Sequence, residues 1–264
     1  MVKQAVIPVA GLGTRMLPAS KAIPKCMLPL YNLPIIHYIV KELKDAGINE
    51  ICIITNPRDK SVKNYFSLND KLTKTLKNQN KILLLNQLTD LMKGLKLHFI
   101  PQTKPAGLAD AIYYARPYIN GSFIVATGDD IFELNVSKQL IDSFEKGMDA
   151  VIATRLVEKE ETRLYGIATT VPYKKGVSKI TALVEKPQFE VNPPLAVSGR
   201  YLFNADIFEK IEKLPENPEK MLTDAIASYD SAYAVQLKGY AFDTGNFIGY
   251  AEAFNYYTKL NQKF

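Results

Sequence analysis

Four short apolar segments constrain the fold of this 264-residue chain most strongly. They span residues 3–9, 51–54, 97–100 and 123–126, and apolar positions do not alternate with polar ones in them. Such runs are typical of strands buried on both faces, as in a parallel sheet covered by helices. Because helix-like patterns separate these segments, the sequence predicts a doubly wound α/β sheet with right-handed crossovers.

The pattern changes after about residue 155. Short strand-like segments joined by turns with proline or glycine favour an antiparallel extension of the sheet. A polar insertion with regularly spaced leucines is expected to form helices on the surface. No repeat or flexible linker divides the chain, so we predict a single domain with a first half at 1–155 and a second half at 156–264. The expected helices are 34–47, 70–93, 107–115, 205–214, 222–229 and 247–257, and the later strands are 165–171, 177–184, 195–203 and 232–242.

Composition excludes several classes of protein. The net charge is +6, but the 33 lysines and arginines are spread along the chain, which argues against nucleic-acid binding. No apolar run reaches the roughly 20 residues that span a bilayer, and no signal peptide is recognisable, so we expect a cytoplasmic protein without membrane partners. Cys26 and Cys52 are isolated thiols, and His37 and His98 are isolated histidines. Catalysis must therefore rely on carboxylates, cationic side chains and backbone groups.

The first strand runs into a small turn at residues 10–15, and Lys25 follows between two prolines. Small residues let the backbone approach a ligand, and consecutive amide groups can bind an anion. We therefore predict a phosphate-binding loop. The loop does not match a dinucleotide-binding fingerprint, which would need a third glycine where the chain has Met16. It is not a Walker loop either, because no glycine is followed by Lys-Ser or Lys-Thr.

Acidic residues follow two predicted strands. Asp129 and Asp130 come after the strand at 123–126, and Asp243 ends the strand at 232–242. Ligands of open α/β sheets bind outside the carboxyl ends of the strands. Two carboxylates from distant parts of the chain, completed by phosphate oxygens and water, form a plausible magnesium site. Successive strand residues face opposite sides, so we expect only one of the adjacent acids to point into the site.

Two further segments carry polar groups that could contribute to a binding site. Gln102 precedes a predicted helix, and its amide has the donor and the acceptor that a base edge requires. Glu185 and Lys186 end an apolar strand and place an acid beside a base. Each of these signals is weak alone; an exposed Glu–Lys pair, for example, is common on protein surfaces. The occurrence of all these motifs together in this order is a stronger signal.

Together these motifs resemble those of the sugar-phosphate nucleotidylyltransferases, and among them the UTP–glucose-1-phosphate uridylyltransferases. The resemblance implies a Rossmann-like mixed, mostly parallel sheet flanked by helices, with a smaller antiparallel sugar-binding extension. It also implies Mg²⁺ dependence and the formation of UDP-glucose and pyrophosphate from UTP and glucose 1-phosphate. The residues that carry it are 10–19, 21–25, 27–29, Gly107-Leu108, 184–187, 199–201, 222–226 and Gly245-Asn246.

The resemblance also assigns roles. Arg15 and Lys25 would contact the phosphates of the nucleotide and, with Lys186 on the phosphate of the sugar, form the catalytic set. Asp129 and Asp243 would bind the metal, although Gly128 stands where relatives often have proline, which leaves the choice between Asp129 and Asp130 open. The expected nucleotide-binding residues are Ala10, Gly11, Leu12, Gly13, Thr14, Gln102, Gly107 and Asp130, and the expected sugar-phosphate residues are Tyr165, Gly166, Glu185, Lys186 and Val197.

The implied chemistry needs no general base, because a sugar 1-phosphate oxygen is already anionic. Alternatives are the same reaction with dTTP or another sugar 1-phosphate, since uracil and thymine present the same hydrogen-bonding edge, and a non-catalytic nucleotide-sugar sensor. We expect a homo-oligomer, a dimer or a tetramer. The apolar stripe of the last helix favours core packing, with a subunit interface as the alternative.

Overall fold

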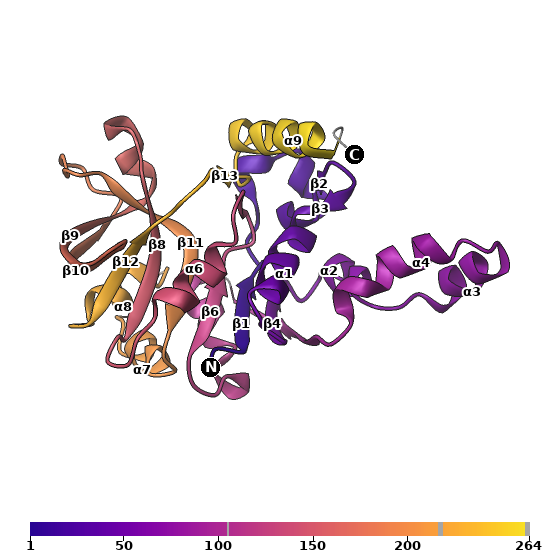
Figure 1. Cartoon of the computed structure of the whole chain (residues 1–264), viewed down its shortest axis with the longest axis horizontal. Helices are drawn as coiled ribbons and strands as arrows, with labels where there is room; N and C mark the ends of the chain where they lie inside the picture. Colours follow the sequence, from indigo (N-terminus) through magenta and orange to yellow (C-terminus); the bar gives the residue numbers. More distant parts are fainter. Residues whose placement is uncertain (105, 216–218, 262–264) are drawn as a thin grey trace.

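The apolar segments form the centre of one mixed sheet. We describe the fold from a computed structural model covering residues 1–104, 106–215 and 219–261. Within these residues the main sheet has nine strands (Figure 1). In spatial order they are β5 (Lys96–Pro101), β4 (Glu50–Thr55), β1 (Gln4–Pro8), β6 (Phe123–Ala126), β11 (Leu195–Phe203), β8 (Ala150–Leu156), β12 (Ala232–Gln236), β10 (Val177–Glu185) and β9 (Gly166–Lys174).

The first half of the chain supplies the parallel part of the sheet. Strand β1 pairs in parallel with β4 on one side and with β6 on the other, and β5 pairs in parallel with β4. The chain therefore winds away from β1 in one direction and returns on its other side. Ligand crevices of α/β sheets open at such a reversal, outside the carboxyl ends of the strands.

The second half supplies the antiparallel pairings, and its β12 also pairs in parallel with β8. Strand β11 pairs antiparallel with both β6 and β8, so this part continues the same sheet. Strand β9 pairs with β10 along most of its length and also with the start of β11. The sheet therefore curls back at this edge. The predicted fold class, a mixed α/β sheet flanked by helices, is confirmed.

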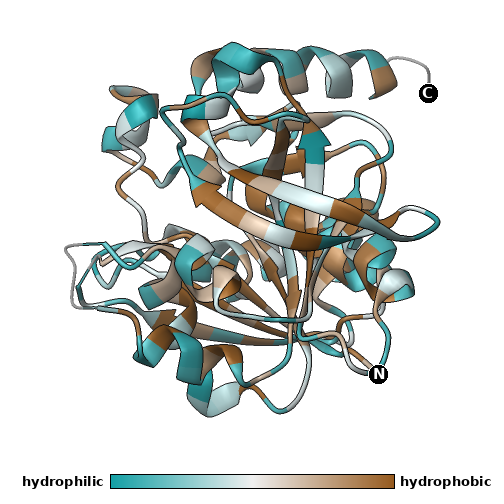
Figure 2. Cartoon of the chain, turned by 90° about the vertical axis from the view of Figure 1, so that its left-hand side faces the viewer, coloured by the Kyte–Doolittle hydropathy of each residue, from teal (hydrophilic) through white to brown (hydrophobic). Residues whose placement is uncertain are grey.

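Two apolar clusters cover the two faces of the sheet. Val6 belongs to one cluster and its neighbour Ile7 to the other, which explains the unalternating sequence of β1. Figure 2 shows hydrophobic strands enclosed by helices that carry hydrophilic surface. The first face is covered by α1 (Ile35–Asp45) and α6 (Val136–Ser143), and the second by α5 (Gly107–Tyr113), α7 (Ile207–Glu212) and α8 (Leu222–Ala227). Helix α9 (Phe247–Asn261) lies beyond the ends of the strands, and its Ala253 belongs to the first cluster (Figure 1).

The predicted surface insertion is helical, but it projects away from the sheet rather than lying on it (Figure 1). It consists of α3 (Asp70–Asn78) and α4 (Ile82–Thr89), and it follows α2 (Ser61–Tyr65). The remaining short elements are β2 (Pro29–Leu30), β3 (Leu33–Pro34) and the 3-10 turns Thr14–Met16, Ala19–Lys21, Lys25–Met27, Asp90–Met92, Arg116–Tyr118 and Lys159–Leu164. Among the described residues, none of the helices has the length and apolar character needed to cross a bilayer.

The strand predicted at 232–242 is two strands. Strand β12 ends at Gln236, and a turn with Gly239 at φ +80° redirects the chain before β13 (Ala241–Asp243). Strand β13 leaves the main sheet and pairs with β7 (Asp130–Phe132) in a separate ribbon. The glycine allows this left-handed backbone, which the apolar pattern alone did not indicate.

Candidate active site

The loop after β1 keeps its backbone accessible. No side chain or backbone atom lies within 4 Å of the position that a Cβ atom would take on Gly11. Gly13 has φ +65°, and its carbonyl accepts a hydrogen bond of 2.7 Å from Ser20 Oγ. Ala10 is buried below the turn, and the Leu12 side chain is exposed above it. The 3-10 turn that starts at Thr14 places Arg15 over the carboxyl ends of the strands.

Two cations and two acids converge beside this loop. Lys25 Nζ forms a close ion pair with Asp129 Oδ2. The Arg15 guanidinium lies 3.9 Å from Asp129 Oδ2 and 3.5 Å from Asp243 Oδ2. A Cβ atom on Gly245 would lie 2.5 Å from Asp129 Oδ2 and 2.8 Å from Asp243 Oδ1, so only glycine fits there. The structure therefore brings together four of the five charged residues predicted to bind phosphate and metal, and the fifth, Lys186, lies beside Glu185.

The β7–β13 ribbon explains how these acids meet. Asp243 and Asp130 are directly opposed in its antiparallel register. The backbone N–H and the Oγ1 hydroxyl of Thr244 both donate to the Asp129 carbonyl oxygen, at 2.8 and 2.6 Å. The end of β13 is thereby fixed to the loop after β6, and the Asp129 and Asp243 carboxylates face the same cations.

Asp129 and Asp130 have different surroundings. Asp130 Oδ2 accepts a hydrogen bond of 2.5 Å from Thr127 Oγ1, whereas Asp129 is paired with Lys25 and Arg15. Burial, with the nearby negative charges of Asp129 and Asp243, raises the pKa of Asp130 to about 7. The expectation that only one of these adjacent acids points into the site is wrong, because both line the same cavity. They differ instead in their hydrogen-bond and ion-pair partners.

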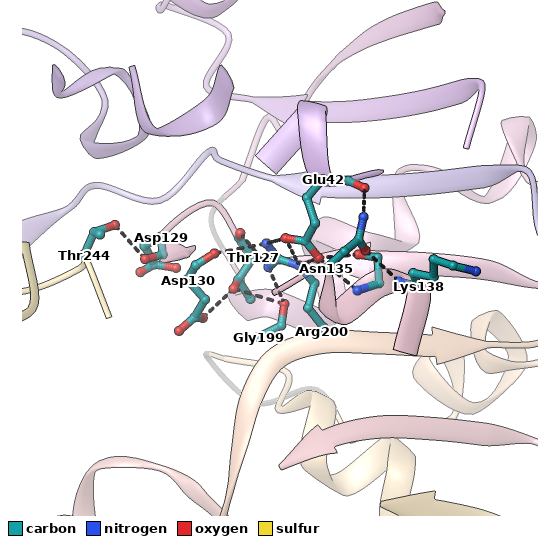
Figure 3. Close-up of polar contacts among 10 residues, drawn as sticks. Glu42, Thr127, Asp129, Asp130, Asn135, Lys138, Gly199, Arg200 and Thr244 are labelled. Atoms are coloured by element: carbon teal, nitrogen blue, oxygen red, sulfur yellow. Dashed lines mark hydrogen bonds and ion pairs between the residues drawn. The ribbon is translucent and has the colours of Figure 1, made fainter. Parts of the chain in front are cut away.

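A buried arginine holds the loop that carries both acids (Figure 3). Arg200 is fully buried, and its Nη2 donates to the Asp130 carbonyl at 3.0 Å and to Glu42 Oε2 at 2.7 Å. Its Nη1 donates to the Gly199 carbonyl at 2.9 Å, and the guanidinium lies 4.8 Å from the centre of the Phe132 ring. Helix α1, which carries Glu42, is thus connected to the acids through one side chain.

The predicted sugar-phosphate residues meet where the sheet curls. Gly166 opposes Glu185 in the β9–β10 register, and a Cβ atom on it would lie 3.1 Å from Glu185 Oε2 and 3.7 Å from Val197 Cγ2. Lys186 has φ +45°, and its backbone N–H donates to the Tyr165 carbonyl at 3.0 Å. Lys186 Nζ lies 3.8 Å from Glu185 Oε1. A left-handed lysine is costly, and such strain is concentrated at functional sites.

One cavity of about 230 Å³ joins the two groups of residues. Arg15, Asp129, Asp130 and Asp243 line it from the acidic side, and the sugar-phosphate side contributes Tyr165, Gly166, Glu185 and Val197. A second cavity of about 430 Å³ lies on the other side of the loop, and its lining includes Gly11, Leu12, Thr14, Asn56 and Arg58. Residues 10–15 therefore separate two recesses at the same edge of the sheet.

Gln102 is buried rather than free. The residue is 6% exposed, and Nε2 donates to Asp110 Oδ2 at 2.7 Å. Gly107 has φ +94°, and a Cβ atom on it would lie 2.8 Å from the Lys220 carbonyl oxygen. Gly107, the first residue of α5, is thus packed against the loop before α8, and Gln102 lies at the carboxyl end of β5.

Comparison with known proteins identifies the family. Residues 4–260 match the family model described as nucleotidyl transferase. The chain belongs to this family. It is 39% identical over 263 residues to the UTP–glucose-1-phosphate uridylyltransferase of Streptococcus pneumoniae, covering 94% of this chain and 88% of that relative. The resemblance recognised in the sequence is therefore confirmed.

Solved structures agree with the assignment. The UTP-bound UGPase of Acinetobacter baumannii superposes with a TM-score of 0.89 at 34% identity, covering 97% of this chain and 93% of that one. A UDP-glucose pyrophosphorylase complexed with UDP-glucose gives a TM-score of 0.88 at 32% identity, with 98% and 99% covered. Membership in the nucleotidyl transferase family thus rests on sequence and on fold.

Sequence reasoning missed three residues that shape this nucleotidyl transferase site. Arg155 lines the 230 Å³ cavity and lies 4.9 Å from the centre of the Tyr165 ring. Its position could have been noticed in the sequence, because Arg155 is a cation near the end of the apolar strand β8. Glu42 and Asp110 lie in ordinary amphipathic helix patterns. Their roles are visible only from their partners in the structure, which are Arg200 and Gln102.

The donor atoms suit a hard divalent cation. Within residues 1–104, 106–215 and 219–261, no cluster of three or more histidine, cysteine or acidic side chains could enclose a metal ion. One carboxylate oxygen of Asp129 and one of Asp243 do lie close to the same point, next to Gly245. Mg²⁺ is often held by one or two carboxylates, with phosphate and water oxygens as the other ligands. The residues present therefore fit such an ion if a phosphate completes its coordination.

Proposed function

We propose that this protein catalyses the reaction of UTP with α-D-glucose 1-phosphate to give UDP-glucose and pyrophosphate. The observation that carries the proposal is the cavity in which Asp129, Asp243 and Arg15 face Glu185 and Gly166. The names of its relatives, and the UTP and UDP-glucose bound in two similar structures, support the choice of substrates. A protein that only sensed nucleotide sugars would not need the phosphate-facing cations beside a pair of metal-binding acids.

The order of the strands supports the arrangement of the substrates. From one edge inward, Gln102 follows β5, Gly11 follows β1, and Asp129 follows β6. Neighbouring strands are about 4.8 Å apart, so β5 and β6 are separated by about 14 Å, the scale of a nucleotide. The base would lie over β5 and β4, the phosphates over β1 and β6, and the sugar phosphate at β11 and β10.

The proposed reaction is an in-line displacement. A phosphate oxygen of glucose 1-phosphate attacks the α-phosphorus of UTP, and the bond between that phosphorus and the bridging oxygen of the leaving pyrophosphate breaks. The nucleophile is anionic, so no side chain has to remove a proton. Catalysis then depends on positioning and on charge stabilisation. Lys25 and Arg15 neutralise the nucleotide phosphates, and Lys186 holds the attacking phosphate.

Mg²⁺ is the expected cofactor. Asp129 and Asp243 would hold it, and when bound it would neutralise phosphate charge during the displacement. Arg15 lies within 4 Å of both carboxylates, and its side chain is 59% exposed, so its guanidinium would also be accessible to the phosphate oxygens of a bound nucleotide. Asp130, whose carboxylate is bonded to Thr127, lies beside this pair and would line the nucleotide site.

Pyrophosphate release tests the proposal. The purified chain is given UTP, dTTP, ATP or GTP with glucose 1-phosphate or N-acetylglucosamine 1-phosphate, with and without Mg²⁺. We expect the highest kcat/KM for UTP with glucose 1-phosphate and no turnover without a divalent cation. Higher kcat/KM with dTTP or with the other sugar would change the assigned substrates. Nucleotide-sugar binding without turnover of any pair would support the sensor alternative.

A further inference from the structure

The buried contact between Gln102 and Asp110 bears on how the site selects its base. Gln102 follows β5, and its backbone N–H donates to the Thr55 carbonyl at the end of β4 at 2.9 Å. Asp110 lies in the first turn of α5, between the buried Ala109 and Ala111. Both partners are thus fixed to regular structure at the substrate edge of the sheet.

The carboxylate determines which way the amide points. Nε2 of Gln102 lies 2.7 Å from Asp110 Oδ2, and an ionised carboxylate only accepts hydrogen bonds. If the amide were flipped, its oxygen would face a carboxylate oxygen at the same distance. That arrangement replaces a charge-assisted hydrogen bond with a repulsion between two acceptors, so Asp110 holds a single amide orientation.

The fixed orientation leaves a defined pattern for a ligand. Asp110 uses one hydrogen of Nε2, and the other hydrogen, together with Oε1, is left as the free edge of the amide. Among the described residues, Oε1 of Gln102 accepts no hydrogen bond. The free edge therefore offers one acceptor and one donor in a fixed order.

This order matches uracil and not cytosine. In uracil, N3–H is a donor beside the acceptor O4, so it needs an acceptor and then a donor from the protein. In cytosine, N3 is an acceptor beside the amino donor at C4, and the required order is reversed. A free glutamine could flip its amide and bind either base equally well, whereas one locked by a carboxylate cannot.

We propose that Asp110 is a specificity-determining positioning residue that makes this site select uridine over cytidine nucleotides by locking the Gln102 amide. The inference rests on the proposed function only in taking Gln102 to contact the base. Asp110 itself touches neither the base nor the reacting phosphates. Its contribution lies in excluding one of the two amide orientations.

The test compares UTP with CTP in Asp110→Asn. The asparagine keeps the shape of aspartate but can donate or accept, so both orientations of Gln102 become possible. We expect the ratio of kcat/KM for UTP over CTP to fall about 10- to 100-fold, the range for one bidentate base contact. The change should come from a lower KM for CTP, while kcat with UTP stays within about threefold.

Two further variants separate this role from a structural one. Glu209→Gln removes an exposed carboxylate from the first turn of the short helix α7, and it should leave the ratio unchanged. Asp110→Ala also frees the amide and should lower the ratio, even if it lowers Tm. Thermal unfolding of all variants identifies a loss of folding.

The outcomes distinguish the inference from the proposed function. An unchanged UTP/CTP ratio in folded Asp110→Asn overturns the inference and leaves the uridylyltransferase assignment intact. If the wild type uses dTTP instead of UTP, the assigned substrate is wrong, but the dTTP/dCTP ratio tests Asp110 in the same way. Calorimetric titration with UTP and CTP gives the binding ratio even without turnover. An equal ratio for wild type and Asp110→Asn in that titration also overturns the inference.

Discussion

Replacing Glu42 with glutamine tests whether the buried ion pair supports the acidic loop. Glu42 accepts from Arg200 Nη2 at 2.7 Å and from Nε at 3.1 and 3.3 Å, and Ser137 Oγ donates to Glu42 Oε1 at 2.6 Å. The Arg200 side chain is 0% exposed and that of Glu42 is 11% exposed. Glu42→Gln leaves the guanidinium buried without its counter-charge, which costs about 3–5 kcal/mol.

Urea unfolding at pH 7 measures this cost. For a chain of this size we expect the midpoint to fall by about 1–2 M with an unchanged m-value. The matched control is Glu212→Gln, because Glu212 pairs with Arg116 at 3.0 Å but both side chains are about half exposed. An exposed pair contributes about 0–1 kcal/mol. A loss in Glu42→Gln no larger than in the control would refute the reasoning.

The same variant has a functional consequence. Arg200 donates to the carbonyls of Gly199 and Asp130, and the latter adjoins Asp129. If Arg200 shifts, the carboxylate of Asp129 shifts with its loop. Displacements of about 1 Å at a reacting centre can cost about 10²-fold in rate. Without urea, under conditions in which Glu42→Gln is folded, we expect its kcat for pyrophosphate release to be about 10- to 100-fold lower than that of the wild type. Glu212→Gln should keep the wild-type kcat.

Three further predictions concern single side chains. Lys25→Ala should lower kcat about 10²–10³-fold, as for the loss of one preorganised charge-stabilising donor, and activity within about threefold of wild type would remove Lys25 from the catalytic set. Of Asp129→Asn and Asp130→Asn, only the first should abolish pyrophosphate release at moderate Mg²⁺, and the reverse result would assign the metal to Asp130. Hydrogen bonds from Lys96 and His98 on β5 lower the pKa of Glu50 from 4.5 to about 2. The ionised form of Glu50 therefore stabilises the fold fully above about pH 4.5. This stabilisation is lost as the pH falls toward 2. Glu50→Gln should therefore be less stable than wild type at pH 7 in urea unfolding, and the difference should disappear near pH 2; a difference independent of pH would contradict this assignment.

Much of the fold followed from local patterns. Strands buried on both faces have a distinctive apolar sequence, so β1, β4 and β6 were predicted close to their observed bounds. The split of the last strand at Gly239 was not predicted, because both halves are apolar and the turn depends on pairing with β7. The projecting arm of α3 and α4 has a helical pattern, but that pattern does not fix its direction relative to the sheet.

The site was predictable where chemistry is concentrated in short motifs. Arg15, Lys25 and Asp129 were recognisable by type and position, and the structure brings them together. Long-range partners were not recognisable. Glu42 and Arg200 are 158 residues apart. Glu42 follows an ordinary amphipathic helix pattern, and Arg200 is a charge within an apolar strand whose sequence does not indicate the partner. Residue type shows what a side chain can do, while the partner that orients it depends on topology. The expected homo-oligomer remains a prediction.

The opposition of Asp130 and Asp243 in the β7–β13 ribbon has a consequence for synthesis. A chain emerging from the ribosome contains the residues of β1, β4, β5 and β6 long before residues 241–243 are added, and in the finished protein these four strands support the loop at residues 10–15. The second acid and the Thr244 hydrogen bonds arrive only with the last tenth of the polypeptide. An incomplete product would lack Asp243, one of the two acids proposed to hold the metal, so we expect nucleotide chemistry to start only when translation is nearly finished.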